Sequence, residues 1–263
     1  MAKGASIKFK SYEQTIPQIL EVLNLSSELK KYDKIILKPF LSPEKELSTP
    51  SDLTEQVLKF VLENKNPVSE VFMAEGADGV ETEELFNHLG YKDIAEKYSI
   101  PFIDLNQTET EIVEHPDFTK FETIHYPKIL RESFVISLAK LMPDPEIALS
   151  GSLSNMLGAF PSSKYSGFFS STKNKIRKWP LRYAIHDIVT CKMPNFALLD
   201  NSEQGTILAG LPLEIDKQAS RILQTDPNEV TYLKLIESSF LKQEEIEKKR
   251  QQARISSEII QKE

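Results

Sequence analysis

The 263-residue chain has one cysteine, four histidines, nine glycines and no long hydrophobic run. Because Cys191 stands alone, the chain cannot form an intramolecular disulfide or supply the cysteine ligands of an iron–sulfur cluster or structural zinc site. No run approaches the ~18 apolar residues of a membrane helix, and the first residues, Met-Ala-Lys-Gly-Ala-Ser-Ile-Lys, lack the apolar core of a secretory signal. We therefore expect a cytoplasmic protein with no iron–sulfur cluster and no membrane contact.

Common catalytic and nucleotide-binding patterns are absent as well. The sequence has no Gly-x-x-x-x-Gly-Lys-Ser/Thr loop, and the turn Gly76-Ala77-Asp78-Gly79 does not match Gly-x-Gly-x-x-Gly. The scattered histidines form no His-x-x-x-His pair. The stretch 151–155 resembles a hydrolase nucleophile elbow only superficially, because Asn155 stands where the second glycine would be. The sequence leaves open whether the protein is an enzyme and which reaction it would perform.

Charge is distributed unevenly along the chain. The 32 Lys and Arg residues against 39 Asp and Glu residues give a net charge of −7, which argues against nonspecific binding to nucleic acid or membrane surfaces. Residues 147–186, here named the basic segment, instead contain six basic side chains and no Asp or Glu. Side chains of mixed sign would serve solubility equally well, so this bias favours a site for an anion.

Short runs rich in β-forming residues alternate with amphipathic helical patterns. The expected strands are residues 7–9, 35–37, 71–74, 102–105, 134–138, 196–199 and 206–208, and the expected helices include 15–25, 53–63, which Ser51 or Asp52 should cap, and 82–98. This alternation predicts an α/β fold, in which a mainly parallel or mixed sheet carries helices on both faces. We expect one domain over residues 1–240 and a charged helical tail over 241–263, either exposed or packed in a homo-oligomer.

In sheets of this kind, functional side chains follow the carboxyl ends of the strands. This rule selects Lys38, Glu75, Lys140 and Asp200, each of which stands at or just after the end of an expected strand. The lysines would neutralise an anion, and a carboxylate would act as a base or a Mg²⁺ ligand.

The Ser/Gly-rich stretch 150–167 suggests how a ligand is held. Ser152 or Ser154 is expected to cap a short helix, and free main-chain N–H groups at a helix start bind anions. We therefore predict a small ligand that carries phosphate or carboxylate, bound at the carboxyl-terminal edge of the sheet. The predicted catalytic residues are Glu75, Lys140 and Asp200, and the predicted ligand-binding residues are Lys38, Ser152, Ser154, Asn155, Gly158 and Lys164.

The cofactor stays open. The acidic turn beginning at Glu75 and Asp78 could hold Mg²⁺ beside a phosphate. Acidic residues in the first turn of a helix also complement its dipole, as Glu83 and Glu84 would do, and no metal ligand is assigned.

A second hypothesis is a noncatalytic interaction protein, in which the basic segment docks an acidic partner and the C-terminal helix mediates assembly. Nucleic-acid binding through the same segment, with Tyr165, Phe168, Phe169 and Trp179 as stacking surfaces, ranks lower because the whole chain is acidic.

Several short motifs follow one another in a recognisable order. They are Ile35-Ile-Leu-Lys-Pro-Phe40, Val71-Phe-Met-Ala-Glu-Gly76, Phe134-Val-Ile-Ser-Leu-Ala-Lys140, Ser154-Asn-Met-Leu-Gly158, Ile185-His-Asp187, Pro194–Asp200, and Leu208-Ala-Gly210 followed by Asp216. Over about residues 30–240 this order resembles the domain of unknown function 362 family, a resemblance that implies an α/β fold but no particular activity.

The chain departs from that family's pattern at several positions. Phe40 stands in place of the Asn of Lys-Pro-Asn, Ser154 replaces the Lys of a Lys-Asn pair, and no histidine follows Lys140 closely. Some relatives carry ferredoxin-like cysteine clusters, so this chain, with its single cysteine, resembles a divergent member without them.

Overall fold

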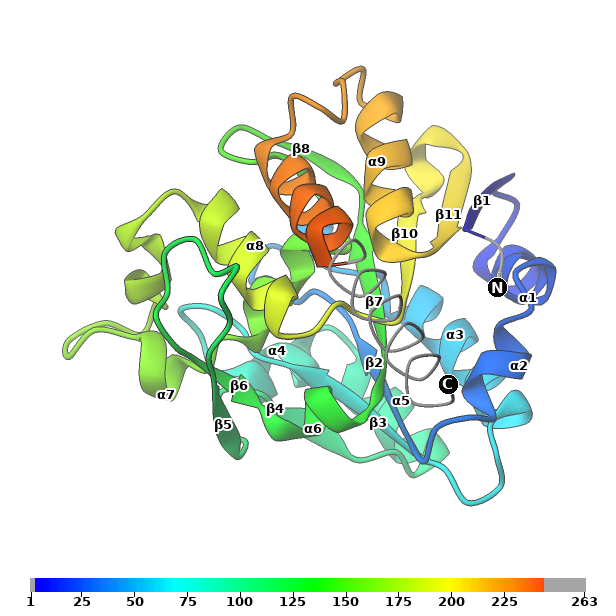
Figure 1. The fold of residues 1–263 in the computed structure, drawn as a ribbon. Coiled ribbons are helices and arrows are strands. Elements are labelled where there is room, and N and C mark those ends of the chain that lie inside the picture. The colour runs from blue at the N-terminus through cyan, green and yellow to red at the C-terminus, as the bar shows by residue number, and fades with distance from the viewer. Residues whose placement is uncertain (1–2, 244–263) are drawn as a thin grey trace, which may run out of the picture.

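A computed structural model describes residues 3–243 of the protein, which fold around a seven-stranded sheet (Figure 1). The sheet consists of β1 (Gly4–Lys8), β2 (Lys34–Lys38), β3 (Glu70–Glu75), β4 (Phe102–Asp104), β7 (Phe134–Lys140), β10 (Phe196–Asn201) and β11 (Thr206–Gly210), in the spatial order β1-β11-β10-β7-β2-β3-β4. Each of the seven expected strands is present in it. The two antiparallel pairs β5–β6 (Thr110–Val113, Ile124–Pro127) and β8–β9 (Met142–Asp144, Ala148–Ser150) lie outside this sheet.

Strand directions confirm the predicted mixed, mostly parallel sheet. The pairs from β10 through β7, β2 and β3 to β4 are parallel, whereas β11 is antiparallel to both β10 and β1. From β2 the chain proceeds outward through β3 to β4 and then returns to place β7 on the other side of β2. The strand order therefore reverses between β2 and β7, and ligands of open α/β sheets bind at such a reversal, beyond the carboxyl ends of the strands.

Helices cover both faces of the sheet, as predicted (Figure 1). They are α1 (Tyr12–Val22), α2 (Leu25–Leu29), α3 (Ser51–Asn64), α4 (Thr82–His88), α5 (Tyr91–Tyr98), α6 (Lys128–Glu132), α7 (Ser162–Tyr165), α8 (Leu181–Cys191) and α9 (Pro212–Ile222), and residues 231–243 are also helical. The alternation of strand side chains divides the core in two: Ile35 and Leu37 pack with α1 to α5, and Ile36 packs on the opposite face, with the core that includes α8 and α9.

Two local predictions were wrong. The helix expected over residues 82–98 is interrupted, because Gly90 has φ +80°, a left-handed conformation that separates α4 from α5. Ser51 is the first residue of α3 rather than its cap, since Pro50 occupies the cap position and no side chain there bonds the free N–H groups.

The described residues bear on two further expectations. None of the helices in residues 3–243 is long and apolar enough to cross a membrane. The charged tail expected over 241–263 lies outside the described residues, apart from 241–243, which continue the helix that starts at 231.

Candidate functional site

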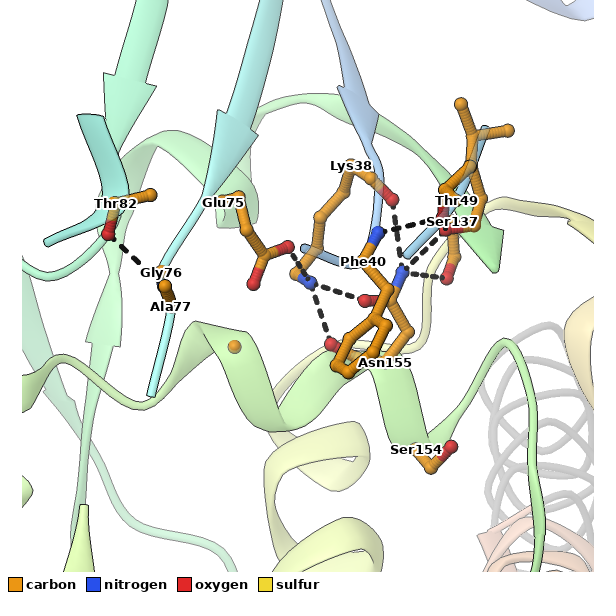
Figure 2. A network of polar contacts seen from close by, with 12 residues as sticks. Lys38, Phe40, Thr49, Glu75, Gly76, Ala77, Thr82, Ser137, Ser154 and Asn155 are labelled. Atoms are coloured by element: carbon orange, nitrogen blue, oxygen red, sulfur yellow. Dashed lines mark hydrogen bonds and ion pairs between the residues drawn. The ribbon is translucent and has the colours of Figure 1, made fainter. Parts of the chain in front are cut away.

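The carboxyl ends of β2 and β3 place a lysine and a glutamate side by side in the interior. Lys38 Nζ lies 2.6 Å from Glu75 Oε2, and the two side chains are 0% and 2% exposed. Lys38 Nζ also donates to the main-chain oxygen of Asn155 at 2.6 Å and to its Oδ1 at 2.8 Å (Figure 2). Burial lowers the pKa of Lys38, and the adjacent Glu75 carboxylate opposes that change. All three donors of the ammonium group therefore have acceptors.

Asn155 connects this ion pair to the reversal point of the sheet. It belongs to the 3₁₀ helix η2 (Ser154–Ala159), and its Nδ2 donates to the main-chain oxygen of Lys38 at 3.0 Å and to Ser137 Oγ at 3.0 Å. Lys38 and Ser137 are neighbours in the parallel β2–β7 register. One amide side chain thus joins η2 to both strands and presents an acceptor to the buried ammonium (Figure 2).

Two glycines allow the backbone to approach this pair closely. A Cβ atom at Gly158 would lie 2.3 Å from Glu75 Oε1 and 2.8 Å from Lys38 Nζ. A Cβ atom at Gly76 would lie 2.5 Å from the main-chain oxygen of Gly158. Any side chain at either position would therefore force the ion pair or the backbone to move, which explains the glycine in the predicted Asn155–Gly158 motif.

A second lysine, Lys173, is buried close to the first but bonded differently. Its side chain is 1% exposed, and Nζ donates to the main-chain oxygens of Gly76 at 2.6 Å and Gly158 at 3.3 Å. Within residues 3–243 no carboxylate makes a salt bridge with this amine, although the main-chain N–H of Lys173 donates to Asp78 Oδ1 at 2.6 Å. Burial lowers the pKa of Lys173 to about 8.

These groups surround a cavity of about 280 Å³, here named the main cleft, at the carboxyl-terminal edge of the sheet. Its polar lining is Ser42, Glu75, Asp78, Asp144, Ser150, Ser154, Asn155, Lys173 and Arg177, and its apolar lining includes Phe40, Leu41, Ile147, Leu157, Ile176 and Leu181. Glu75 Oε2 is used by Lys38, and no described residue hydrogen-bonds Oε1. The cleft therefore offers a carboxylate oxygen, a buried amine and an apolar wall to a small molecule.

Five of the residues selected from the sequence belong to this site. Glu75, Ser154, Asn155 and Gly158 line the main cleft, and Lys38 lies buried against Glu75. The Ser154 hydroxyl does not cap η2 as expected; it accepts from the main-chain N–H of Gly151 at 2.9 Å.

Lys140 and Asp200 lie at a different cavity of about 150 Å³, between the ends of β7 and β10. Lys140 Nζ is 2.7 Å from Glu203 Oε1, and Asp200 accepts hydrogen bonds from the Tyr12 hydroxyl and the Ser202 N–H at 3.0 Å each. Burial raises the pKa of Tyr12. These two residues are not brought together with Glu75, and their part in ligand binding stays a prediction.

Ser152 has an internal partner. Its N–H and hydroxyl donate to Asp216 Oδ1 at 2.9 and 2.7 Å, and the N–H of Leu153 donates to Oδ2 at 3.0 Å. Burial raises the pKa of Asp216 to about 6. The main-chain groups expected to bind a ligand thus hold a carboxylate from α9, while Lys164, the remaining predicted residue, is exposed and outside the main cleft.

Sequence reasoning missed Lys173 and Arg177 as lining residues of the main cleft, and named Asp78 only as part of an acidic turn that could hold Mg²⁺. Lys173 and Arg177 belong to the basic segment, whose lack of acidic residues was the relevant signal, but nothing local separates them from its other basic residues. In residues 3–243 no group of three or more His, Cys, Asp or Glu side chains is placed to hold a metal ion.

The fold is thus of the α/β class, and the candidate site is a buried lysine–glutamate pair at the point where the strand order reverses. The chain belongs to the family described as Domain of unknown function (DUF362), whose model matches residues 35–206, so the predicted family is confirmed. No curated protein matches the sequence.

Among solved structures, the lactate racemase apoprotein from Thermoanaerobacterium thermosaccharolyticum is similar in fold. The match has a TM-score of 0.56 and 14% sequence identity, and covers 85% of this chain and 56% of the racemase chain. The chain thus matches little more than half of the racemase, and at this identity the likeness shows a shared α/β fold alone.

The Lys38–Glu75 pair is expected to be a strongly coupled contributor to stability. Glu75→Gln should lower the free energy of unfolding by about 3–5 kcal/mol, because it leaves a buried ammonium without its counter-charge, and Lys38→Met should cost a similar amount. The double variant should lose clearly less than the sum of the two, as measured by urea unfolding. Lys31→Met, at an exposed ion pair, is the control and should change little, and additive losses at Lys38 and Glu75 would contradict the coupling.

Lys173 should make stability increase at alkaline pH. The folded chain releases the Lys173 proton near pH 8, whereas an unfolded lysine keeps it up to its ordinary pKa of 10.5, so between these values the unfolded state binds more protons. Relative to Lys173→Met, the wild-type chain should gain up to about 3 kcal/mol of unfolding free energy between about pH 7 and pH 10.5. Urea unfolding of both chains across this range is the measurement, and parallel pH curves would contradict the assignment.

Proposed function

We propose that the protein binds a small metabolite carrying a carboxylate or phosphate in the main cleft. The observation that carries this proposal is the amine of Lys173, which is buried at the cleft wall and bonded by main-chain carbonyls rather than by a carboxylate. An ammonium group has three donors, and the two carbonyls leave one for a ligand. A buried charge without a carboxylate in direct contact is best satisfied by an anion from outside.

The charges around the main cleft support this assignment and would set the orientation of a bound ligand. Lys38 and Glu75 neutralise each other, which leaves the charge of Lys173 uncompensated by that pair. Arg177 adds a cation at the rim, where its side chain is 53% exposed and pairs with Glu146. Asp144 also lines the main cleft, so the ligand would turn its anionic group to Lys173 and Arg177 and its hydroxyl or amine groups to the carboxylates.

The dimensions and lining favour a small molecule over a dinucleotide. A volume of about 280 Å³ lies just below the usual range for ligand pockets, which begins at about 300 Å³. Phe40, Leu157 and Leu181 supply apolar contacts, and Glu75 Oε1 is the group suited to accept a proton from a bound ligand. The reaction itself is not assigned.

Ligand binding can be tested by thermal unfolding with inorganic phosphate, dicarboxylates and phosphorylated metabolites, each with and without Mg²⁺. A ligand at ~100 times its dissociation constant should add about 2.7 kcal/mol and raise the midpoint by about 5–10 °C. The shift should fall in Arg177→Ala, which loses a cation at the main cleft, and persist in Lys164→Ala, which loses an exposed cation of the same segment outside it.

Lys140→Ala decides between the two cavities. A shift that survives Arg177→Ala but disappears in Lys140→Ala would move the ligand to the smaller cavity beside Asp200 and contradict the main cleft. If no ligand produced a shift, anion binding itself would be contradicted.

A second candidate function, docking of an acidic partner by the basic segment, is favoured by one observation. Phe168 and Phe169 are 95% and 96% exposed and stack edge to face, with ring centroids 4.8 Å apart. Lys164, Lys175 and Lys178 are exposed in the same segment. Exposed aromatic rings among cations suit a surface that meets acidic and apolar groups together.

The docking hypothesis predicts salt-sensitive binding of a labelled poly-glutamate peptide that contains phenylalanine, measured by fluorescence anisotropy. Phe168→Ser/Phe169→Ser should weaken this binding at least threefold without lowering the unfolding midpoint, because both rings are exposed. Phe118→Ser, which removes a partly buried ring elsewhere, is the control for a general loss of apolar surface. Binding unaffected by the double substitution would exclude this surface.

A further inference from the structure

We propose that Lys173 is a nucleophile that forms an imine with an aldehyde or ketone whose anionic group is bound in the main cleft. This inference rests on the proposed function, because it takes the same cleft and the same class of anionic ligand. It goes further in two respects: the ligand would also carry an aldehyde or ketone group, and Lys173 would form a covalent bond with it.

The first argument is the contrast between the two buried lysines. Lys38 has its three donors bonded by Glu75 and Asn155, is 0% exposed and does not line the main cleft. Lys173 is equally buried, yet it lines the main cleft and only main-chain carbonyls accept from its amine among the described residues. A salt-bridged ammonium has no electron pair to offer, whereas an amine held by two carbonyls keeps one position free when it is neutral.

The second argument is protonation. Burial brings the pKa of Lys173 to about 8, against an ordinary lysine value of 10.5. At pH 7 the neutral, nucleophilic fraction of such an amine is roughly 300-fold larger than that of a lysine at the ordinary value. Lysines that form imines are activated in this way, by removal from water or by a neighbouring cation. Removal from water is the main cause of the lowered pKa of Lys173; Lys38 also lowers it, and Glu75 has a larger effect in the opposite direction.

The third argument is the position of groups that can move protons. Lys173 Nζ bonds the main-chain oxygen of Gly76, the residue next to Glu75, and Glu75 is the nearby charge with the largest effect on Lys173. Both Glu75 and Lys173 line the main cleft, and no described residue hydrogen-bonds Glu75 Oε1. A carboxylate in the same cleft can take the proton that nitrogen loses and return it to the departing water.

The chemical step balances without any further reactant. The Lys173 nitrogen lone pair attacks the carbonyl carbon and the carbonyl oxygen takes a proton, which gives a carbinolamine. Loss of water then forms the carbon–nitrogen double bond, and no electron donor or acceptor is consumed. Arg177 would hold the carboxylate or phosphate of the same ligand at the rim of the main cleft.

Trapping with glyoxylate, a small aldehyde that carries a carboxylate, tests the inference on the full chain at about pH 7. Sodium cyanoborohydride reduces an imine with glyoxylate to a stable carboxymethyl amine, which peptide mapping by mass spectrometry assigns to a residue. We expect Lys173 to be modified at least tenfold faster than the exposed Lys164, and the equally buried Lys38 to stay unmodified. Inorganic phosphate should slow the modification of Lys173 by competing for the same anion site.

Variants separate this inference from the proposed function. Lys173→Arg keeps a cation but cannot form an imine, so the fast-reacting site should disappear, while the thermal shift of the wild-type chain with phosphate reports on the anion site by itself. If that variant does not fold, the mapping on the wild-type chain still decides, because it compares Lys173 with Lys164 and Lys38 in one molecule.

Two outcomes would overturn one proposal each. Ligands that raise the unfolding midpoint while Lys173 reacts no faster than Lys164 would overturn the nucleophile and leave the anion site standing. Fast modification of Lys173 that phosphate does not slow, together with no thermal shift from any anion, would keep a reactive amine and overturn the anion site.

Discussion

The structure around the carboxyl-terminal edge of the sheet depends on the need to bury the Lys38 ammonium group with all its donors satisfied. Glu75 supplies the counter-charge from the next strand, and Asn155 supplies two oxygens from η2. Gly76 and Gly158 are required because a Cβ atom at Gly158 would overlap with the ion pair, and one at Gly76 would overlap with the backbone of Gly158. A buried pair of this kind is costly to desolvate and is better explained by the site it forms than by stability alone.

Lys173 changes the character of this edge. Two lysines and a single glutamate share one interior region, so the second amine has carbonyl partners in place of a carboxylate. Its burial is maintained by the loop after β3, where Asp78 accepts from the main chain of Lys173. The two buried lysines therefore differ in chemistry: the ammonium group of Lys38 is paired with a carboxylate, whereas the amine of Lys173 is bonded only by main-chain carbonyl dipoles among the described residues.

Much of the fold and part of the site follow from sequence. Strand periodicity predicts all seven sheet strands, and the strand-end rule then finds Lys38 and Glu75, because both are fixed by the ends of adjacent strands. The same rule selects Lys140, but the Lys140 side chain lines the smaller cavity. The position of a residue at a strand end does not determine which cavity its side chain lines. Lys173 was not predicted because its burial arises from contacts with Gly76 and Gly158, residues distant in the chain.

Asp216 links the site to α9, which follows the last strand of the sheet in the chain. Its carboxylate accepts hydrogen bonds from the main-chain N–H groups of Ser152 and Leu153, although Asp216 lies more than 60 residues further along the chain. Residues 150–159 precede α9 in the chain, so during synthesis they emerge before the carboxylate that accepts from the N–H groups of Ser152 and Leu153. A chain that ends before residue 216 would therefore contain all of the main-cleft residues and still lack the carboxylate that accepts from Ser152 and Leu153.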